Sequence, residues 1–115
     1  MNCRKPQGPF AAVLLLGALL LSSWTGTAHA RDPIAGKVSA ASCATCHGPL
    51  GLSQLPNAPH LAGQPAIYLV EQLKNYRSGK RQNEMMNVMA KPLTDQEIDN
   101  LAAWYESIQI SVTVR

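Results

Sequence analysis

Residues 43–47 read Cys-Ala-Thr-Cys-His, and this short stretch decides what kind of fold the chain can adopt. Two cysteines separated by two residues, with a histidine directly after the second, form the attachment signature of c-type haem. On a short helical stretch this spacing places both sulfurs on one side, where they can bond the two vinyl-derived carbons of a porphyrin. His47 then lies beneath the iron and can become its proximal ligand. The motif predicts one covalently attached haem c, with Cys43 and Cys46 as the thioether residues.

Two other interpretations of the cysteine pair each lack something in this chain. A structural zinc site has four ligands, commonly including a second Cys or His pair, and His60 is the only distant candidate for the fourth. A redox-active dithiol of the thioredoxin kind stands near a βαβ pattern, and the sequence contains no convincing strand. The dithiol is the stronger of these two alternatives to haem.

The first thirty residues differ in composition from the rest and predict a secretory signal peptide. They contain a positive segment at residues 4–5, an apolar run at residues 10–21 and a small-x-small cleavage site at residues 28–30. The apolar run is short for a membrane span, which needs about 20 apolar residues. We expect this leader, including Cys3, to be removed by cleavage after Ala30. An uncleaved anchor is the alternative.

The domain expected after cleavage, residues 31–115, carries eight Lys or Arg against seven Asp or Glu, so its formal charge is +1. A charge so close to zero argues against nucleic acid as a partner. Nothing after residue 30 approaches the length of a membrane span. With the leader removed, we expect one periplasmic domain, present as a monomer.

The remaining sequence predicts helices and loops, and hence an all-α domain. Asp32 can cap a first helix that has Pro33 at its first position. A loop containing three prolines is expected from residue 48 to residue 63. A second helix is expected to begin at Pro65 and to end at Gly79.

The last helix has the clearest start. Thr94 and Glu97 form a capping box, while Leu93 and Ile98 occupy the two positions of a hydrophobic staple. An apolar stripe at helical spacing follows. Its members are Ile98, Leu101, Ala102, Tyr105 and Ile108.

Large apolar side chains are scarce in the expected domain. Its 85 residues include no Phe, one Trp and three Tyr. A domain of this size also buries a smaller share of its surface than a larger one. A covalently held porphyrin would supply the missing apolar bulk, so we expect the chain without haem to be molten or unfolded.

The iron of an electron carrier needs a ligand at its second axial position, so that it changes oxidation state with little rearrangement and binds no substrate. A thioether ligand favours ferrous iron and raises the reduction potential. Met85, Met86 and Met89 are candidates, in what we expect to be a loop before the last helix. The ordinary role of a methionine is flexible core filling. His60 is the competing axial ligand.

Several further motifs lie along the chain. They are Pro59-His60-Leu61-Ala62-Gly63-Gln64, Gly79-Lys80-Arg81, Met86-Asn87-Val88-Met89, Leu93-Thr94-Asp95-Gln96-Glu97-Ile98 and Leu101-Ala102-Ala103-Trp104-Tyr105. Together with the Cys-x-x-Cys-His motif, they resemble the class I c-type cytochromes, especially the short bacterial c553 type and the single domains of the dihaem c4 type. The resemblance covers almost all of residues 34–108. It implies a small class I cytochrome c fold with helices packed around one covalently attached haem.

The resemblance also implies roles for particular residues. Pro59 would offer its backbone carbonyl to the free ring nitrogen of His47, a contact that fixes the orientation and basicity of the imidazole. Met86 matches the family's axial position, with Met85 and then Met89 as alternatives. The dihaem relatives carry two such domains and this chain has one, so electron transfer between domains would need a partner.

Four basic residues gather near the end of the second expected helix. They are Lys74, Arg77, Lys80 and Arg81. The simplest interpretation is complementation of the helix dipole and a solvated face. The alternatives are a docking surface for an acidic redox partner, or a contact from Arg81 to a haem propionate. Two ionised propionates would bring the domain to a charge of about −1, so strong electrostatic steering is not predicted.

These observations predict a periplasmic monohaem electron carrier with His/Met ligation that cycles between Fe(II) and Fe(III) and is not an enzyme. Its partners would be redox proteins, either membrane complexes or soluble oxidases and reductases. Two alternatives stay open. One is a haem-binding subunit dedicated to a single oxidoreductase complex, and the other is a haem sensor or haem enzyme whose sixth iron position is open.

Overall fold

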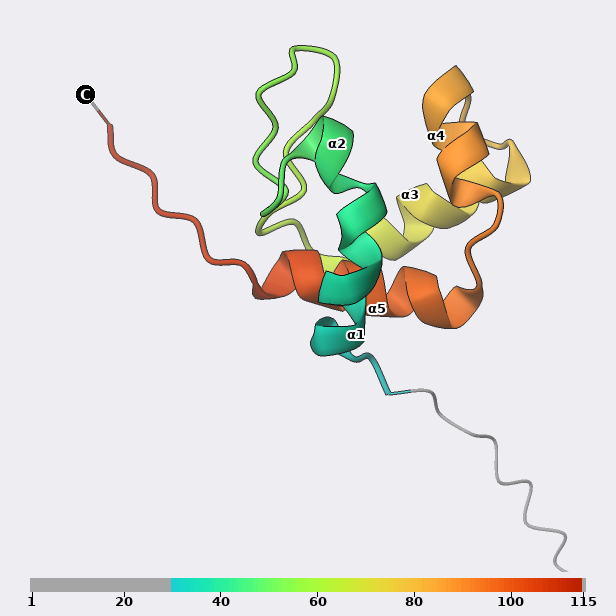
Figure 1. Ribbon diagram of the computed structural model, residues 1–115, viewed down its shortest axis with the longest axis horizontal. Coiled ribbons are helices and arrows are strands. Elements are labelled where there is room, and N and C mark those ends of the chain that lie inside the picture. The colour runs from blue at the N-terminus through green and yellow to red at the C-terminus, as the bar shows by residue number, and fades with distance from the viewer. Residues whose placement is uncertain (1–29, 115) are drawn as a thin grey trace, which may run out of the picture.

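The computed structural model describes residues 30–114, so the predicted leader, apart from Ala30, lies outside the described residues. Within this span every regular element is a helix (Figure 1). In chain order they are α1 (Pro33–Ser39), the 3-10 helix η1 (Ala40–Ser42), α2 (Ala44–His47), α3 (Ala66–Ser78), α4 (Glu84–Ala90) and α5 (Asp95–Ser107). No helix of residues 30–114 is long and apolar enough to cross a bilayer. The predicted all-α class is confirmed.

Helix α1 begins where the sequence predicts, because Asp32 caps it. The Asp32 carboxylate accepts hydrogen bonds from the amides of Ile34 (2.8 Å) and Ala35 (3.1 Å). The helix then crosses α5 (Figure 1). At Gly36 the two backbones are so close that an added Cβ would overlap the carbonyl oxygen of Asn100.

The most apolar side chains of α1 face the solvent. Ile34 is 76% exposed and Val38 is 74% exposed, although their spacing is helical. The buried positions are Gly36 and, in η1, Ala40. Because α5 approaches so closely, this crossing selects residues by small size rather than by hydrophobicity.

Helix α5 has the start and the buried stripe that the sequence predicts. The Thr94 hydroxyl accepts a hydrogen bond from the Glu97 amide (3.2 Å), and the Glu97 carboxylate accepts one from the Thr94 amide (2.8 Å). This is the predicted capping box. Ile108 caps the other end and is half-buried. The other four members of the predicted stripe are buried, namely Ile98, Leu101, Ala102 and Tyr105.

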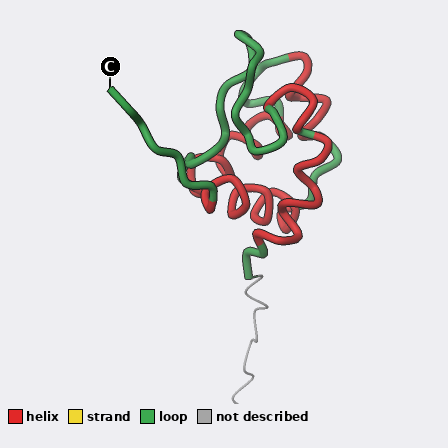
Figure 2. The backbone as a smooth tube through the Cα atoms, turned by 60° about the vertical axis from the view of Figure 1, so that its left-hand side comes forward, coloured by secondary structure: helices red, strands yellow, loops and turns green. Residues whose placement is uncertain are grey.

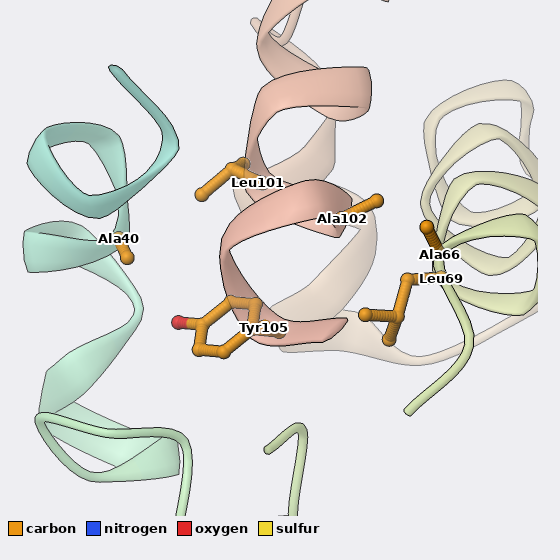
Figure 3. Close-up of a cluster of buried hydrophobic side chains, with 6 residues drawn as sticks. All are labelled: Ala40, Ala66, Leu69, Leu101, Ala102 and Tyr105. Atoms are coloured by element: carbon orange, nitrogen blue, oxygen red, sulfur yellow. The ribbon is translucent and has the colours of Figure 1, made fainter. Parts of the chain in front are cut away.

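Helices α3 and α5 enclose a small apolar core together with η1 (Figure 3). The buried cluster consists of Ala40, Ala66, Leu69, Leu101, Ala102 and Tyr105. Half of its members are alanines. Among the residues that the structure describes, the largest fully buried side chains are Ile98 and Leu101. The core is therefore thin, as the composition predicts.

Helix α3 ends at Gly79, as predicted. Gly79 adopts φ +79° in the left-handed region, where a residue without Cβ is favoured, and its amide donates to the carbonyl of Tyr76.

The methionines stand on a helix, and the prediction that they lie in a loop is wrong. Helix α4 carries Met85, Met86 and Met89. Asn83 caps it, because its side chain accepts a hydrogen bond from the Met86 amide (2.9 Å) and its own amide donates to the side chain of Asn87 (2.7 Å). An Asn at this position is a helix start signal, so the cap is visible in the sequence.

The long connection between α2 and α3 is a loop, as predicted (Figure 2). The carbonyl of Gly51 accepts hydrogen bonds from the amides of Leu61 (2.7 Å) and Ala62 (3.1 Å). Gly51 also packs on the ring of Tyr105, since an added Cβ would lie 2.8 Å from two ring carbons. The Gly63 amide donates to the Tyr105 carbonyl (2.8 Å). The loop is thereby fixed to itself and to α5.

Candidate haem site

The two cysteines of the motif stand where two short helices meet. Cys43 lies between the last residue of η1, Ser42, and the first of α2, Ala44. The His47 amide donates to the Cys43 carbonyl (3.0 Å), so one helical turn joins the first cysteine to the histidine. Cys43 and Cys46 are half-buried free thiols that form no disulfide with each other. Both sulfurs are therefore available for a different covalent bond.

His47 is buried, with 7% of its surface exposed, and a hydrogen bond defines its orientation. Its Nδ1 lies 2.9 Å from the carbonyl oxygen of Pro59. Because a carbonyl can only accept, Nδ1 is the protonated nitrogen in this contact. Nε2 then keeps its lone pair, which is the form in which a neutral imidazole binds a metal. The contact that the resemblance implies between these residues is present in the structure.

A cavity of about 730 Å³ opens beside His47. Pockets for ligands commonly measure about 300–1,000 Å³. The wall includes the three motif side chains and all three methionines of α4, namely Cys43, Cys46, His47, Met85, Met86 and Met89. Helices α3 and α5 add apolar side chains, among them Leu69, Leu73, Leu101 and Ala102. The structure thus gathers the motif and the three methionines around one cavity.

The side chains around this cavity fit a haem. Leu55, Tyr68 and Met85 line it, yet they are 45%, 44% and 60% exposed. Apolar surface in water is unfavourable, and a large apolar group in the cavity would cover it. The two thiols and Nε2 of His47 are the reactive groups that haem c uses. The reactive groups and the apolar side chains on the cavity wall therefore both fit a haem.

The three methionines differ in their exposure. Met85 is largely exposed, whereas Met86 and Met89 are half-buried.

The side-chain amide of Asn87 ties α4 to the end of α3. It donates to the carbonyl of Tyr76 (2.6 Å) and to the carbonyl of Arg81 (2.8 Å), which lies just beyond α3. Sequence reasoning missed the role of Asn87. Its place four residues after Asn83 fits the contact with that cap (2.7 Å) but gives no signal of the contact with Tyr76.

Arg81 lies on the cavity wall, and its guanidinium group is held in place. Nη1 donates to Oε1 of Gln72 (2.6 Å), and the group lies 4.7 Å from the centre of the Tyr76 ring. All three residues line the cavity. A cation held in this way can pair with an anionic group of a ligand.

Two of the other basic residues are paired within the chain. Arg77 donates to Asp95 (2.6 Å), and Nζ of Lys74 lies 3.9 Å from the same carboxylate. The hydrogen bond from Arg77 and the two nearby positive charges hold the pKa of Asp95 below its usual value. Lys80 is exposed. Lys74 and Arg77 therefore join α3 to the start of α5, a role that neither the helix-dipole interpretation nor the docking interpretation predicted.

His60 also lines the cavity, but one of its nitrogens is engaged. Its Nδ1 accepts a hydrogen bond from the Ser53 amide (2.9 Å). The preceding residue, Pro59, contacts Nδ1 of His47, which is the edge of that ring away from Nε2. His60 therefore belongs to the loop on the Nδ1 side of His47, whereas the methionines come from α4.

Tyr105 has a second role beside its place in the core, since it also lines the cavity. Burial, with a smaller contribution from the neighbouring Cys43, raises the pKa of its phenol above the usual value. The phenol is therefore neutral at neutral pH. The apolar stripe predicted a buried residue here, but only the fold brings Tyr105 next to Cys43.

A helical domain with a thin core, an apolar cavity and a Cys-x-x-Cys-His motif on its wall defines a protein that binds haem c covalently. The comparison with known families agrees. The sequence model of the family described as Cytochrome c matches residues 34–109. The chain belongs to the cytochrome c family, and the predicted covalent attachment through the motif of Cys43, Cys46 and His47 is confirmed.

Relatives within this family are similar over most of the described domain. The chain is 42% identical to cytochrome c4 of Pseudomonas aeruginosa, over 86% of this chain and 50% of the relative. It is 40% identical to cytochrome c-554(548) of Halomonas halodenitrificans, over 68% of this chain and 98% of the relative. The crystal structure of reduced cytochrome c4 from Pseudomonas stutzeri superposes with a TM-score of 0.67 at 38% identity, over 72% of this chain and 48% of that one.

These comparisons confirm the predicted resemblance and the cytochrome c fold. The chain spans about half the length of the cytochrome c4 relatives that it matches.

Proposed function

We propose that this protein is a monohaem electron carrier that passes single electrons by cycling between Fe(II) and Fe(III), and that it is not itself an enzyme. The observation that carries this proposal is that His47 and the three methionines of α4 lie on the wall of the same cavity. Two ligands from the protein leave no open iron position for a substrate. A thioether as the second ligand also raises the reduction potential.

In this proposal Cys43 and Cys46 would hold the haem through thioether bonds. Nε2 of His47 and the sulfur of Met86 would bind its iron. When bound, the haem supplies a one-electron couple. Nδ1 of His47 keeps its proton and donates it in a hydrogen bond to the Pro59 carbonyl, 2.9 Å away, and this contact orients the ring.

Met86 is preferred for three reasons, the first of which distinguishes it from Met85 alone. It is half-buried where Met85 is largely exposed, so it can approach an iron atom with little loss of solvation. Its amide is bound by the Asn83 cap (2.9 Å), which fixes the first turn of α4. It also occupies the position that the resemblance implies. Met85 and then Met89 remain the alternatives.

Other residues of the chain would prepare the site for electron transfer. The apolar side chains of α3 and α5 would surround a bound haem, and burial of the group is one of the properties that set its reduction potential. Arg81, already held by Gln72 at 2.6 Å, would pair with a propionate.

We also propose that residues 1–30 are a signal peptide cleaved after Ala30, that residues 31–115 form the haem domain, and that this domain acts as a monomer in the bacterial periplasm. The charged segment, apolar run and small-x-small site support the cleavage. The intact mass of the protein from its native host would report both events. The expected mass is that of residues 31–115 plus one haem, and a mass that includes the leader would contradict the proposal.

The partners in this proposal are redox proteins. One relative suggests a more specific arrangement, because it is named "Thiosulfate dehydrogenase electron acceptor" in Thiomonas intermedia and is 39% identical over 92% of this chain and 46% of its own length. A carrier dedicated to one dehydrogenase is therefore the second candidate. Stoichiometric co-purification with a single oxidoreductase would favour it, and fast electron exchange with several unrelated partners would favour the general carrier.

The ligation can be tested spectroscopically. The oxidised holoprotein is expected to show the near-red charge-transfer band of a Met–iron bond, and the reduced form is expected not to bind carbon monoxide rapidly. Voltammetry should give one reversible one-electron wave. Rapid carbon monoxide binding with no such band would instead establish an open sixth position and a sensor or enzyme.

Three matched variants identify the methionine. Met86→Ala is expected to remove the charge-transfer band and to lower the reduction potential, because the thioether that favours Fe(II) is lost. Met85→Ala and Met89→Ala remove the same side chain from the same helix and should leave the band in place. If the band survives in Met86→Ala and disappears in one of the other two, that residue is the ligand.

A further inference from the structure

The loop between α2 and α3 contains one buried polar side chain whose contacts lead back to the proximal histidine. Ser53 is only 7% exposed, whereas Leu52 and Gln54 on either side of it are exposed. A buried hydroxyl needs hydrogen-bond partners, because an unsatisfied one costs about 1–3 kcal/mol. The hydrogen-bond partners of Ser53 therefore identify the groups that this part of the loop holds together.

Ser53 connects the loop to the haem motif. Its hydroxyl donates to the carbonyl of Cys46 (2.9 Å) and accepts from the amide of Leu55 (3.0 Å). Its own amide donates to Nδ1 of His60 (2.9 Å). Because Nδ1 accepts here, the neutral His60 ring carries its proton on Nε2. One serine therefore binds the residue before His47 and the residue after Pro59.

These contacts close a ring. Cys46 precedes His47 in the chain, and His60 follows Pro59. The carbonyl of Pro59 accepts a hydrogen bond from Nδ1 of His47 (2.9 Å). Starting from His47, the path runs through Cys46, Ser53, His60 and Pro59 and returns to the imidazole. Every link is a peptide bond, a side chain or a hydrogen bond of 2.9 Å. The Pro59 carbonyl is therefore held relative to the same motif that it supports.

We propose that Ser53 and His60 are positioning residues that set the distance and angle of the Pro59 carbonyl at His47, and so tune the reduction potential of the iron. The inference rests on the proposed function, because it concerns the same axial ligand. A well-placed carbonyl draws the Nδ1 proton and makes the imidazole a stronger donor. A stronger donor stabilises Fe(III) more than Fe(II). Loosening the carbonyl should therefore raise the potential.

A competing structural explanation is present in the same loop. The Gly51 carbonyl accepts from the amides of Leu61 and Ala62, which also follow Pro59. If those two bonds fix Pro59 by themselves, then Ser53 and His60 only fill space. The two explanations differ in one measurable respect, because only the first makes the potential depend on the acceptor atom at position 60.

The test compares two substitutions at that position in the holoprotein. His60→Asn places a side-chain oxygen near the position of Nδ1 and can accept from the Ser53 amide, whereas His60→Leu cannot. We expect the ratio of reduced to oxidised protein at a fixed applied potential to rise several-fold in His60→Leu, because a weaker imidazole donor stabilises Fe(III) less. His60→Asn should stay close to the unmodified protein. Gln54→Ala, on the same loop, is the control for loop substitutions.

A second readout follows the proton itself. Hydrogen exchange of the His47 Nδ1–H, measured by NMR in the reduced holoprotein, should be faster in His60→Leu and in Ser53→Ala, and near normal in His60→Asn. Equal potentials and equal exchange rates in His60→Leu and His60→Asn would overturn the inference, even if Ser53→Ala does not fold. The proposed carrier function is judged separately, by the reversible wave and charge-transfer band of the unmodified protein.

Discussion

Replacing Gly36 by alanine would test the close contact between the backbones of α1 and α5 where the two helices cross. In a solvent-exposed helix this substitution stabilises by about 1 kcal/mol, because glycine has the lower helix propensity. Here the added Cβ would overlap the backbone carbonyl oxygen of Asn100 and lie 2.9 Å from Cβ of Trp104. Neither atom can move away by rotating a side chain. The two helices must therefore separate.

The magnitude follows from these two opposing terms. Forcing extra atoms into a packed contact costs about 1–3 kcal/mol, and a backbone obstacle places Gly36→Ala at the upper end. After the gain of about 1 kcal/mol in helix propensity, the expected loss in the free energy of unfolding is about 2 kcal/mol. For a domain of this size that corresponds to a decrease in melting temperature of about 8–16 °C.

The assay is guanidinium and thermal unfolding of the holoprotein, followed by circular dichroism and by the haem absorbance. Val38→Ala is the control, because Val38 lies on the same helix but is exposed, and its effect should stay within about 0.5 kcal/mol. A Gly36→Ala protein as stable as the unmodified one, or more stable, would refute the reasoning. It would show that helix propensity outweighs the contact with Asn100.

Three further predictions concern the cofactor, the methionine helix and pH. Cys43→Ala with Cys46→Ala should give protein without covalent haem and without a cooperative melting transition; a well-folded colourless protein would contradict the cofactor's role in the core. Asn87→Ala removes the hydrogen bonds from α4 to the carbonyl of Tyr76 in α3 and to the carbonyl of Arg81 just beyond it, so the charge-transfer band should disappear at a lower temperature than in the unmodified protein. Asp95→Asn should lower the melting temperature at pH 7 and make no difference in strong acid; a constant difference at all pH values would be inconsistent with ion pairing.

The sign of the Asp95 prediction follows from its pKa, which is lower in the folded protein than its usual value of 3.8. The ion pair with Arg77 therefore stabilises the fold fully above pH 3.8, and this contribution is lost as the pH falls through the pKa of the folded state. Because the carboxylate is exposed, the effect should be small and should weaken in salt.

Local signals in the sequence determined the elements whose cause lies within a few residues. The capping box of Thr94 and Glu97 predicts the start of α5 because both partners stand within one helical turn. Gly79 predicts the end of α3 because a left-handed residue is needed there. The Cys-x-x-Cys-His motif predicts covalent haem for the same reason, since three neighbouring side chains supply the attachment.

Features that depend on contacts between distant segments required the tertiary structure. The buried face of α1 contains Gly36 rather than Ile34 or Val38, because the approach of α5 excludes larger residues. No apolar pattern encodes that approach. Helix α4 is a partly local case, since its Asn83 cap was visible in the sequence, but its attachment to α3 through Asn87 was not.

The surroundings of His47 show the same division most clearly. The sequence by itself determined that this imidazole follows an attachment motif, because the two cysteines are its neighbours in the chain. The support of its ring by Ser53 and His60 required the tertiary structure, because loop closure brings Ser53 within hydrogen-bond distance of both Cys46 and His60, each seven residues away from it in the chain. Spacing along the chain specifies hydrogen bonds within one helical turn, as in the capping box, but not hydrogen bonds between segments that meet only through loop closure.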